Sequence, residues 1–439
     1  MQFLRKVPAW LGTLLIAVGI FTFVYVSNAT ELITPYIYSV ILLAGIAAIS
    51  ALGLNLIYGF NGQFSLGHIG FYAIGAYGSA LITKDFTARW SGTQFTALSW
   101  IIAGIAGVIL ILLIAKWLHL GRLGKSLKSS LAILRPSESW ILIAVVMIVV
   151  GALTVAAGAV SAWILQKGLF ALFKLTIPLL PKAVAENVIL LFGLLAGGSL
   201  AALIAYLVGL PLLRLSSDYF GIATLGFSVV VYTALQNSDL VIATMKGARG
   251  MVEIPRWTTW LWVFAVLVVL VIMMRNLLHS SHGRAVISVR EDEVAAKAMG
   301  IDIAQSKVVA FAIGGFYAGI AGGLYAHLMG FLHPSTFNFI RGFDPLIIIV
   351  FGGLGSMTGT LVASALFSLI IEGLRVVLPQ GFEDWRFVIY PILLLIVMLL
   401  RQRGLLGSVE WGWMRAPLAP IRDIPMASGL NPIDGGEEA

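Results

Sequence analysis

The sequence of 439 residues has no cysteine and few charged side chains. Without cysteine, disulfide bonds, thiolate nucleophiles and cysteine-based metal sites are excluded. Charged residues make up 11% of the chain, whereas soluble domains average about 25%. Hydrophobic residues reach 59%, so the polar residues are too few to cover a soluble protein of this size, and a disordered chain is excluded as well. The composition therefore indicates an integral membrane protein.

Long apolar runs recur along the whole chain. A helix needs about 20 apolar residues to cross the hydrocarbon core of a bilayer, which is about 30 Å thick. The alternating pattern of an outer-membrane barrel is absent, so the runs predict helices. We expect an all-α, polytopic inner-membrane helical bundle. The apolar runs lie at residues 9–26, 35–58, 64–83, 98–118, 139–160, 187–209, 219–237, 258–274, 308–330, 344–370 and 385–401.

Lysine and arginine indicate the orientation. The net charge is +8, and basic residues gather near the N-terminus, in the loops 116–135 and 275–307, and in the tail 401–422. Such residues are enriched in the cytoplasmic loops of membrane proteins, whereas a nucleic-acid-binding role fits the apolar composition poorly. We therefore expect both termini in the cytoplasm. The first run favours a retained helix over a cleavable signal peptide, since no small-residue cleavage pattern stands out before Asn28.

Eleven full spans cannot leave both termini on one side, so one run must enter and leave on the same face. The run 344–370 is the best candidate, because Gly352, Gly353 and Gly355 interrupt it. The sequence therefore predicts about ten crossings plus one re-entrant hairpin. We assign residues 1–415 to one membrane domain, within which the segment of about 120–186 is set apart. Residues 416–439 are rich in proline, glycine and acids and are expected to form a disordered cytoplasmic tail.

The segment 55–77 joins two apolar runs through polar, uncharged residues and the glycines Gly59, Gly62, Gly67 and Gly70. Glycines would bend or break the helix, and freed backbone groups near the middle of the bilayer can coordinate a polar solute. An ordinary short cytoplasmic loop with glycine and asparagine turns explains the same residues equally well. His68 is expected to be a hydrogen-bonded packing residue, because no second histidine or carboxylate lies at metal-ligand spacing.

Small residues mark two further segments. Thr224, Gly226 and Ser228 predict one small, weakly polar helix face, which suits close packing more often than a narrow solute path. Glycine at every fourth position, from Gly315 to Gly323, predicts a flat face against which another helix packs closely. The glycines at 352–355 are not a phosphate-binding loop, because no Gly-Lys-Ser/Thr follows them.

The loop 281–307 is the most charged part of the chain. Its residues 285–299 predict a single amphipathic helix with an apolar stripe at Val286, Val289, Val294 and Met299, ended by Gly300. Such a helix, tied at both ends to membrane spans, suits docking of a cytosolic partner. A solvated connecting loop is the alternative.

Five segments, in this order, resemble the permease subunits of the branched-chain amino-acid ABC importers of the LivM type. They are NLIYGFNGQFSLGHIGFYAIGAY, LRLSSDYFGIATLGF, GRAVISVREDEVAAKAMGI, AFAIGGFYAGIAGGLYAH and VFGGLGSMTG, and the resemblance covers roughly residues 40–400. It does not include residues 120–186. In that family an EAA-type element contacts the ATP-binding subunits. The resemblance implies that Glu293, Ala295, Ala296 and Gly300 form it here, with Val294 as an extra residue in the pattern.

The resemblance further implies a second permease of the LivH type, two ATP-binding subunits and a periplasmic or lipoprotein substrate-binding protein as partners. ATP would be hydrolysed by those partner subunits, so no catalytic residue, metal or cofactor is expected in this chain. Aromatic residues near the broken segment would accept an apolar side chain, and the amides and hydroxyls would bind the zwitterion. The candidate translocation pathway comprises Asn61, Gln63, Phe64, Ser65, His68, Tyr72 and Thr224, with Phe71 as a further aromatic candidate.

The lead hypothesis is thus a permease that moves branched-chain or similar small amino acids into the cell. A permease of the same group for urea or short amides is the first alternative. An intramembrane enzyme is disfavoured because the histidines are scattered and lack nearby carboxylates. A stand-alone channel or secondary transporter is disfavoured because the apolar runs hold almost no charges for ion coupling.

Overall fold

The computed structural model describes residues 34–88, 181–213, 215 and 217–377, together with 103–107, 158–168, 404–407 and a few single positions. The regular secondary structure of the described part is helical apart from one isolated bridge between Met251 and Leu332. The α-helices are α2 (Pro35–Leu54), α3 (His68–Ala88), α7 (Lys182–Leu212), α8 (Ser217–Gln236), α9 (Trp260–His279), α10 (Ser281–Glu291), α11 (Glu293–Ala298), α12 (Ile303–Met329), α13 (Phe343–Gly352) and α14 (Met357–Val377). The π-helical segment η2 is Asn55–Phe60, and 3-10 turns are Ser238–Leu240, Ala243–Met245, Gly247–Arg249, Pro334–Phe337 and Phe339–Gly342.

Five segments are long and apolar enough to cross a membrane: Pro35–Phe60, Ala183–Leu212, Tyr219–Gln236, Trp260–His279 and Ile303–Met329. They confirm the predicted helices at 35–58, 187–209, 219–237, 258–274 and 308–330. The predicted runs 9–26, 98–118, 139–160 and 385–401 lie mostly outside the described residues, as does most of the segment 120–186, and the tail 416–439 lies wholly outside them. The number of crossings therefore stays a prediction.

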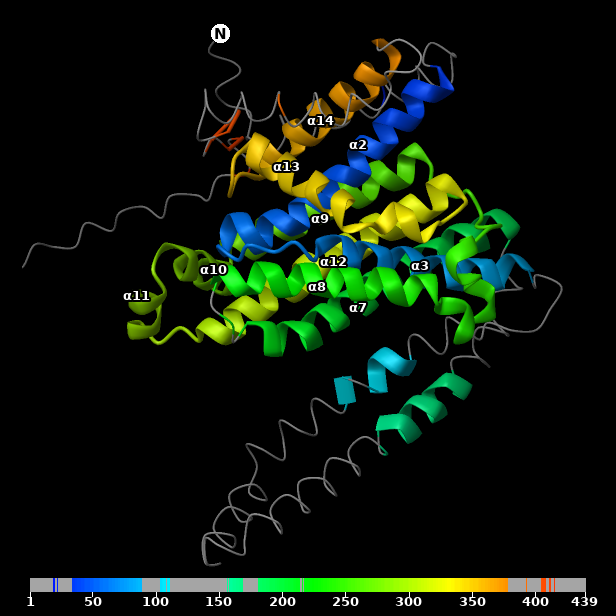
Figure 1. Cartoon of the computed structure of the whole chain (residues 1–439), viewed down its shortest axis with the longest axis horizontal. Helices are drawn as coiled ribbons and strands as arrows, with labels where there is room; N and C mark the ends of the chain where they lie inside the picture. Colours follow the sequence, from blue (N-terminus) through cyan, green and yellow to red (C-terminus); the bar gives the residue numbers. More distant parts are fainter. Residues whose placement is uncertain are drawn as a thin grey trace, which may run out of the picture.

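Helix α12 lies at the centre of the bundle and packs against α7, α3 and α2 (Figure 1). The predicted flat glycine face is confirmed, because a Cβ on Gly319 would lie 2.7 Å from the Ala201 Cβ and 2.9 Å from the Gly198 Cα, both on α7. On the neighbouring face, a Cβ on Gly322 would clash with the Tyr72 carbonyl oxygen of α3. The small residues therefore set how closely these three helices approach.

The two ends of the bundle are distinct. Helices α10 and α11 lie together at one end, which we call the α10 end (Figure 1). The π-helical end of α2 reaches the α10 end, where the Arg290 guanidinium donates to the Gly59 carbonyl. At the other end, which we call the Tyr36 end, the Tyr36 hydroxyl at the start of α2 donates to the Glu372 carboxylate near the end of α14, at 2.5 Å.

The run 344–370 is broken at its glycines, as predicted. Gly353 and Gly355 adopt φ values of 116° and 80°, which favour glycine, and the chain reverses from α13 into α14. The turn lies near the α10 end, because the Gly355 amide donates to the Asn55 side chain at 2.9 Å. Helix α13 has 10 residues, about 15 Å at 1.5 Å per residue. It is therefore too short to cross a bilayer by itself.

The prediction of one helix over 285–299 is wrong. Asp292 has φ −158° and ψ 111°, and its carboxylate accepts from the Val294 and Ala295 amides as the N-cap of a new helix, α11. A side chain that caps its own backbone competes with helix continuation, which ends α10 at Glu291. The predicted apolar stripe is wrong for the same reason. Val286 and Val289 are buried, but Val294 is 80% and Met299 82% exposed.

The predicted shared face of Thr224, Gly226 and Ser228 is also wrong. Thr224 and Ser228 are four residues apart and both are buried, whereas Gly226 is exposed with nothing within 4 Å of a Cβ built on it. Residues two apart lie on nearly opposite faces of a helix. Only Thr224 and Ser228 therefore face the bundle.

Candidate functional site: a cavity beside a broken helix pair

A cavity of about 200 Å³ lies among α2, α3, α12, α13 and α14. Its volume is below the 300–1,000 Å³ typical of sites for drug-sized ligands, so it suits a small metabolite. The lining is mainly apolar along α2 and α13, whereas polar and charged side chains come from α3, α12 and α14, from the chain before α13 and from the first turn of α13. The lining residues are Val40, Leu43, Ile46, Ala47, Ser50, His68, Ile69, Tyr72, Tyr325, Thr336, Arg341, Asp344, Pro345, Ile348, Phe367, Ser368, Ile371 and Glu372.

His68 is a buried polar group in this lining. It is 1% exposed, and its Nε2 lies 2.8 Å from the Ser50 carbonyl oxygen. A carbonyl can only accept, so Nε2 carries the proton and Nδ1 of the neutral ring is an acceptor. Within the described residues, Nδ1 has no hydrogen-bond partner. The predicted packing role accounts for one ring nitrogen and leaves the other available.

Opposite charges meet at the accessible part of the cavity. The Arg341 guanidinium lies 3.6 Å from the Asp344 carboxylate, and the two side chains are 54% and 25% exposed. The Tyr72 and Tyr325 rings, 5.8 Å apart, lie beside them. An ion pair next to an apolar floor can bind a ligand that carries both charges and an apolar group.

The segment between α2 and α3 is broken as the glycine-rich pattern predicts. After the π-helical segment η2, Gly62 adopts φ 75°. Asn61 and Gln63 are 2% and 5% exposed, and none of their four amide side-chain atoms has a hydrogen-bond partner within the described part of the chain. Buried polar groups of native proteins are nearly always paired. These two amides are therefore the strongest indication in the broken segment of a site for water or a solute.

The broken segment and the α13–α14 turn are joined through Asn55. Its side-chain amide donates to the Ser356 carbonyl and to the Thr360 hydroxyl, both at 2.9 Å, while its oxygen accepts from the Gly355 amide at 2.9 Å. Asn55 is fully buried. Its hydrogen bonds close the bundle between the cavity and the α10 end.

The remaining pathway candidates lie apart from the cavity. The Leu66 amide donates to the Thr224 hydroxyl of α8 at 3.0 Å, and the Phe64 and Tyr58 rings meet edge to face at 5.3 Å. Ser65 is 1% exposed, and Phe71 packs against Phe311 of α12 at 5.2 Å. Of the predicted pathway residues, the structure thus brings His68 and Tyr72 into the cavity lining.

The predicted docking loop forms a compact unit at the α10 end. Glu293 forms an ion pair with Lys307 of α12 at 2.6 Å, Ala296 is buried and Ala295 is exposed. Gly300 has φ 80° and its amide donates to the Lys297 carbonyl. This confirms that Gly300 ends a helix, although that helix is the short α11.

Two contacts at the α10 end were not anticipated from the sequence. The Arg290 guanidinium, described above, connects α10 to the end of η2. Glu410 accepts from the Met357 and Thr358 amides at 2.6 and 3.1 Å, and so caps α14 from the C-terminal segment. The capping pattern could not reveal Glu410, because the capped amides lie more than fifty positions earlier in the sequence.

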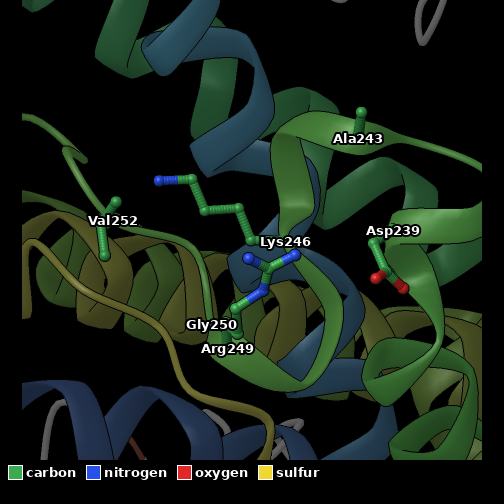
Figure 2. A pocket seen from close by; sticks show the side chains of 6 residues that line it. All are labelled: Asp239, Ala243, Lys246, Arg249, Gly250 and Val252. Atoms are coloured by element: carbon green, nitrogen blue, oxygen red, sulfur yellow. The ribbon is translucent and has the colours of Figure 1, made fainter.

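A second pocket, of about 600 Å³, lies in the chain between α8 and α9. Figure 2 shows Lys246 and Arg249 side by side, with Asp239 across from them. Leu240 and Val241 in the same segment are 84% and 86% exposed. This segment, which we call the α8–α9 loop, thus combines two cations with two exposed apolar side chains.

The comparisons with known proteins identify the family. A family described as the branched-chain amino acid transport system / permease component matches residues 139–398. The chain belongs to this family. The matched residues begin inside the segment 120–186, which the sequence analysis set apart. The family is that of a transport permease component, and the several apolar helices of the bundle agree with a membrane permease.

Three relatives carry related names. The high-affinity branched-chain amino acid transport system permease protein LivM of Escherichia coli (strain K12) is 28% identical over 243 residues, 48% of this chain and 55% of that protein. A probable branched-chain amino acid transport permease protein LivM of Methanocaldococcus jannaschii is 25% identical over 268 residues, 54% of this chain and 72% of that protein. The LivH permease protein of Salmonella typhimurium is 24% identical over 189 residues, 43% of this chain and 58% of that protein.

The chain thus spans about half the length of the Escherichia coli relative. No solved structure is similar to it at a significant level.

Proposed function

We propose that this chain is the permease subunit of an ATP-driven importer that moves branched-chain or similar small amino acids into the cell. Family membership and the LivM and LivH names of the relatives support it. The single observation that carries the proposal is a cavity lined by α2, α3, α13 and α14, the helices that flank two breaks joined by the Asn55–Gly355 hydrogen bond. Irregular backbone at membrane depth is typical of transport sites.

The proposed assembly contains a second permease of the LivH type, two ATP-binding subunits and a periplasmic or lipoprotein binding protein. The chain itself needs no cofactor, because ATP is held by the partners. It lies in the inner membrane with both termini in the cytoplasm and has about ten crossings plus the hairpin α13–α14. The α10 end then faces the cytoplasm, and the Tyr36 end and the α8–α9 loop face outward.

The ATP-binding subunits dock on α10 and α11 in this proposal. The docking element comprises Glu293, Ala295, Ala296 and Gly300; the buried Ala296 supports it from within the fold, and the exposed Val294 and Met299 extend it with apolar surface. Exposed apolar residues on a rigid, capped turn suit a protein interface better than water. The contact is linked to the bundle through the Glu293–Lys307 ion pair and the Arg290–Gly59 hydrogen bond.

Transport follows by alternating access. In the described conformation the Asn55 hydrogen bonds and Arg290 close the α10 side, while the cavity lies toward the Tyr36 side. A movement of α10 driven by the ATPases would pull Arg290 away from Gly59 and separate η2 from the Gly355 turn. The unpaired amides of Asn61 and Gln63 would then bind the passing solute, while Phe64, Ser65 and Thr224 shape the route beside them.

Reconstituted uptake tests this function. The complete complex in vesicles, with binding protein and ATP, is expected to accumulate leucine, with competition by isoleucine and valine and none by urea. A non-hydrolysable ATP analogue is the control. Competition by urea with no leucine uptake would support the alternative permease for urea or amides, and uptake that ignores nucleotide would contradict an ABC importer.

A further inference from the structure

The cavity has two chemically different parts. Its accessible part carries the Arg341–Asp344 ion pair, of which Arg341 is 54% exposed. Its inner part is apolar and closed: Ile46 is 2% and Ile348 1% exposed. A ligand that fills it must therefore be polar at one end and apolar at the other.

The polar end must carry both charges. The Arg341 guanidinium and the Asp344 carboxylate are 3.6 Å apart, so a ligand with a single charge would face one favourable and one unfavourable neighbour. An α-amino acid places an ammonium and a carboxylate on one carbon atom and can face both. The guanidinium is suited to bind a carboxylate through paired N–H donors.

A third polar group supports a ligand at this place. The Nδ1 acceptor of His68, which has no partner within the described residues, belongs to a side chain that lines the cavity and is 1% exposed. A ligand ammonium has three N–H donors, and the Asp344 carboxylate cannot accept from all of them. His68 Nδ1 is a further acceptor for one of them. Glu372 also lines the cavity, but its carboxylate accepts from the Tyr36 hydroxyl.

We propose that this cavity binds the amino acid zwitterion on its way through the permease. Arg341 faces the ligand carboxylate, Asp344 faces its ammonium, and the branched side chain lies against Ile46 and Ile348. The proposal rests on the proposed transport function and adds the residues that hold the solute. Urea has neither the charges nor the apolar group, so the cavity selects against it.

The absence of native cysteine allows a direct binding test. Ser368→Cys places one thiol in the lining of the cavity, and its labelling by a methanethiosulfonate reagent is followed in the assembled complex without nucleotide. Leucine at about ten times its dissociation constant is expected to slow labelling about tenfold, since only the free site reacts. Urea, leucinamide and 4-methylpentanoate, which lack one or both charges, are expected to have little effect. Glu253→Cys, an exposed position outside the cavity, is the control and should label equally with and without leucine.

Variants of the ion pair assign the two contacts. In the Ser368→Cys background, Arg341→Gln and Asp344→Asn are each expected to remove the protection by leucine. An unchanged labelling rate without ligand shows that the cavity has kept its shape.

Protection by leucine that persists in both variants would overturn the proposal. Leucine transport by a complex that shows no protection would overturn it while leaving the transport function intact. Protection without any ATP-driven transport would instead contradict the transport function alone.

Discussion

Single residues carry the chemistry of the broken segment. Asn61 and Gln63 are buried, and their side-chain amides have no hydrogen-bond partner among the residues that the structure describes. Such burial costs free energy unless a ligand or water pairs the amides. The His68 Nε2 is hydrogen-bonded, whereas Nδ1 has no partner in the described part of the chain. Buried polar groups of this kind indicate a step of transport in which water or the solute forms hydrogen bonds with them.

Replacing both amides should slow transport. Asn61→Ala and Gln63→Ala are each expected to lower leucine uptake by about fivefold, the loss of roughly 1 kcal/mol per hydrogen bond to the passing solute. Uptake in vesicles at saturating ATP is the measurement, and Asn276→Ala, an exposed amide on α9, is the control. Uptake equal to that of the parent protein in both variants would exclude these side chains from the pathway.

Glu293 allows a docking role to be separated from a structural one. Glu293→Lys is expected to abolish transport and the binding of the ATPases, because it reverses the charge of the contact and breaks the ion pair with Lys307. Combining it with Lys307→Glu restores an internal ion pair without restoring the charge at position 293. The double variant is therefore expected neither to transport leucine nor to co-purify with the ATPases. Recovery of transport would mean that Glu293 acts only within the chain.

At the scale of elements, the structure joins three segments that are far apart in sequence. Arg290 at the end of α10 contacts the end of η2, and Asn55 of η2 binds the turn between α13 and α14. The C-terminal segment adds Glu410 at the start of α14. A displacement of α10 thus acts on both broken segments together.

Removing the Arg290 contact should uncouple ATP hydrolysis from transport. Arg290→Ala is expected to keep ATPase activity stimulated by the binding protein, while the number of ATP molecules used per leucine rises on the order of tenfold. Arg284→Ala is the matched control, since within the described residues the Arg284 guanidinium donates to the His279 carbonyl near its own helix. An equal number of ATP molecules used per leucine in both variants would show that Arg290 does not transmit the movement of α10.

At the scale of the whole molecule, glycine and alanine faces allow α12 to approach α7 and α3. Such packing leaves almost no room for added atoms, because a Cβ on Gly322 would overlap the α3 backbone. The polar cavity and the broken segments are surrounded by this tightly packed frame. Movement is therefore expected to take place at the breaks and not within α12.

Adding one methyl group tests the frame. Gly322→Ala is expected to lower stability by about 1–3 kcal/mol through overpacking, seen as a lower midpoint of thermal unfolding of the purified complex. Gly226→Ala is the control, because a Cβ there meets nothing within 4 Å and helix propensity favours alanine. Equal midpoints for the two variants would contradict close packing at Gly322.

Under the proposed function, we expect the α8–α9 loop to contact the binding protein. Lys246→Glu with Arg249→Glu is expected to reduce stimulation of the ATPases by the binding protein about tenfold at low salt, since reversing interface charges slows association. The reduction should shrink as salt is added. Lys167→Glu, at an exposed lysine above Trp163, is the control. An unchanged dependence on binding-protein concentration would exclude this loop from the contact.

The sequence by itself determined the class of the protein and most of its elements. Apolar runs of about 20 residues must be helices in a bilayer, and glycines placed the breaks at Gly62 and Gly353 and the helix end at Gly300. These features depend on local chemistry, which the sequence contains directly. The same local chemistry was present in Asp292, but its role as a helix cap was missed because good helix formers surround it.

The tertiary structure alone decided which residues share a site. Asn55 and Gly355 are 300 positions apart. Arg341 and Asp344 join His68 in one cavity only because the turn Phe339–Gly342 and the start of α13 fold back beside α3. The pattern of apolar residues along the sequence does not predict such contacts, since they depend on how the helices pack against one another. The candidate pathway named from the sequence therefore included His68 and Tyr72 but lacked the ion pair opposite them.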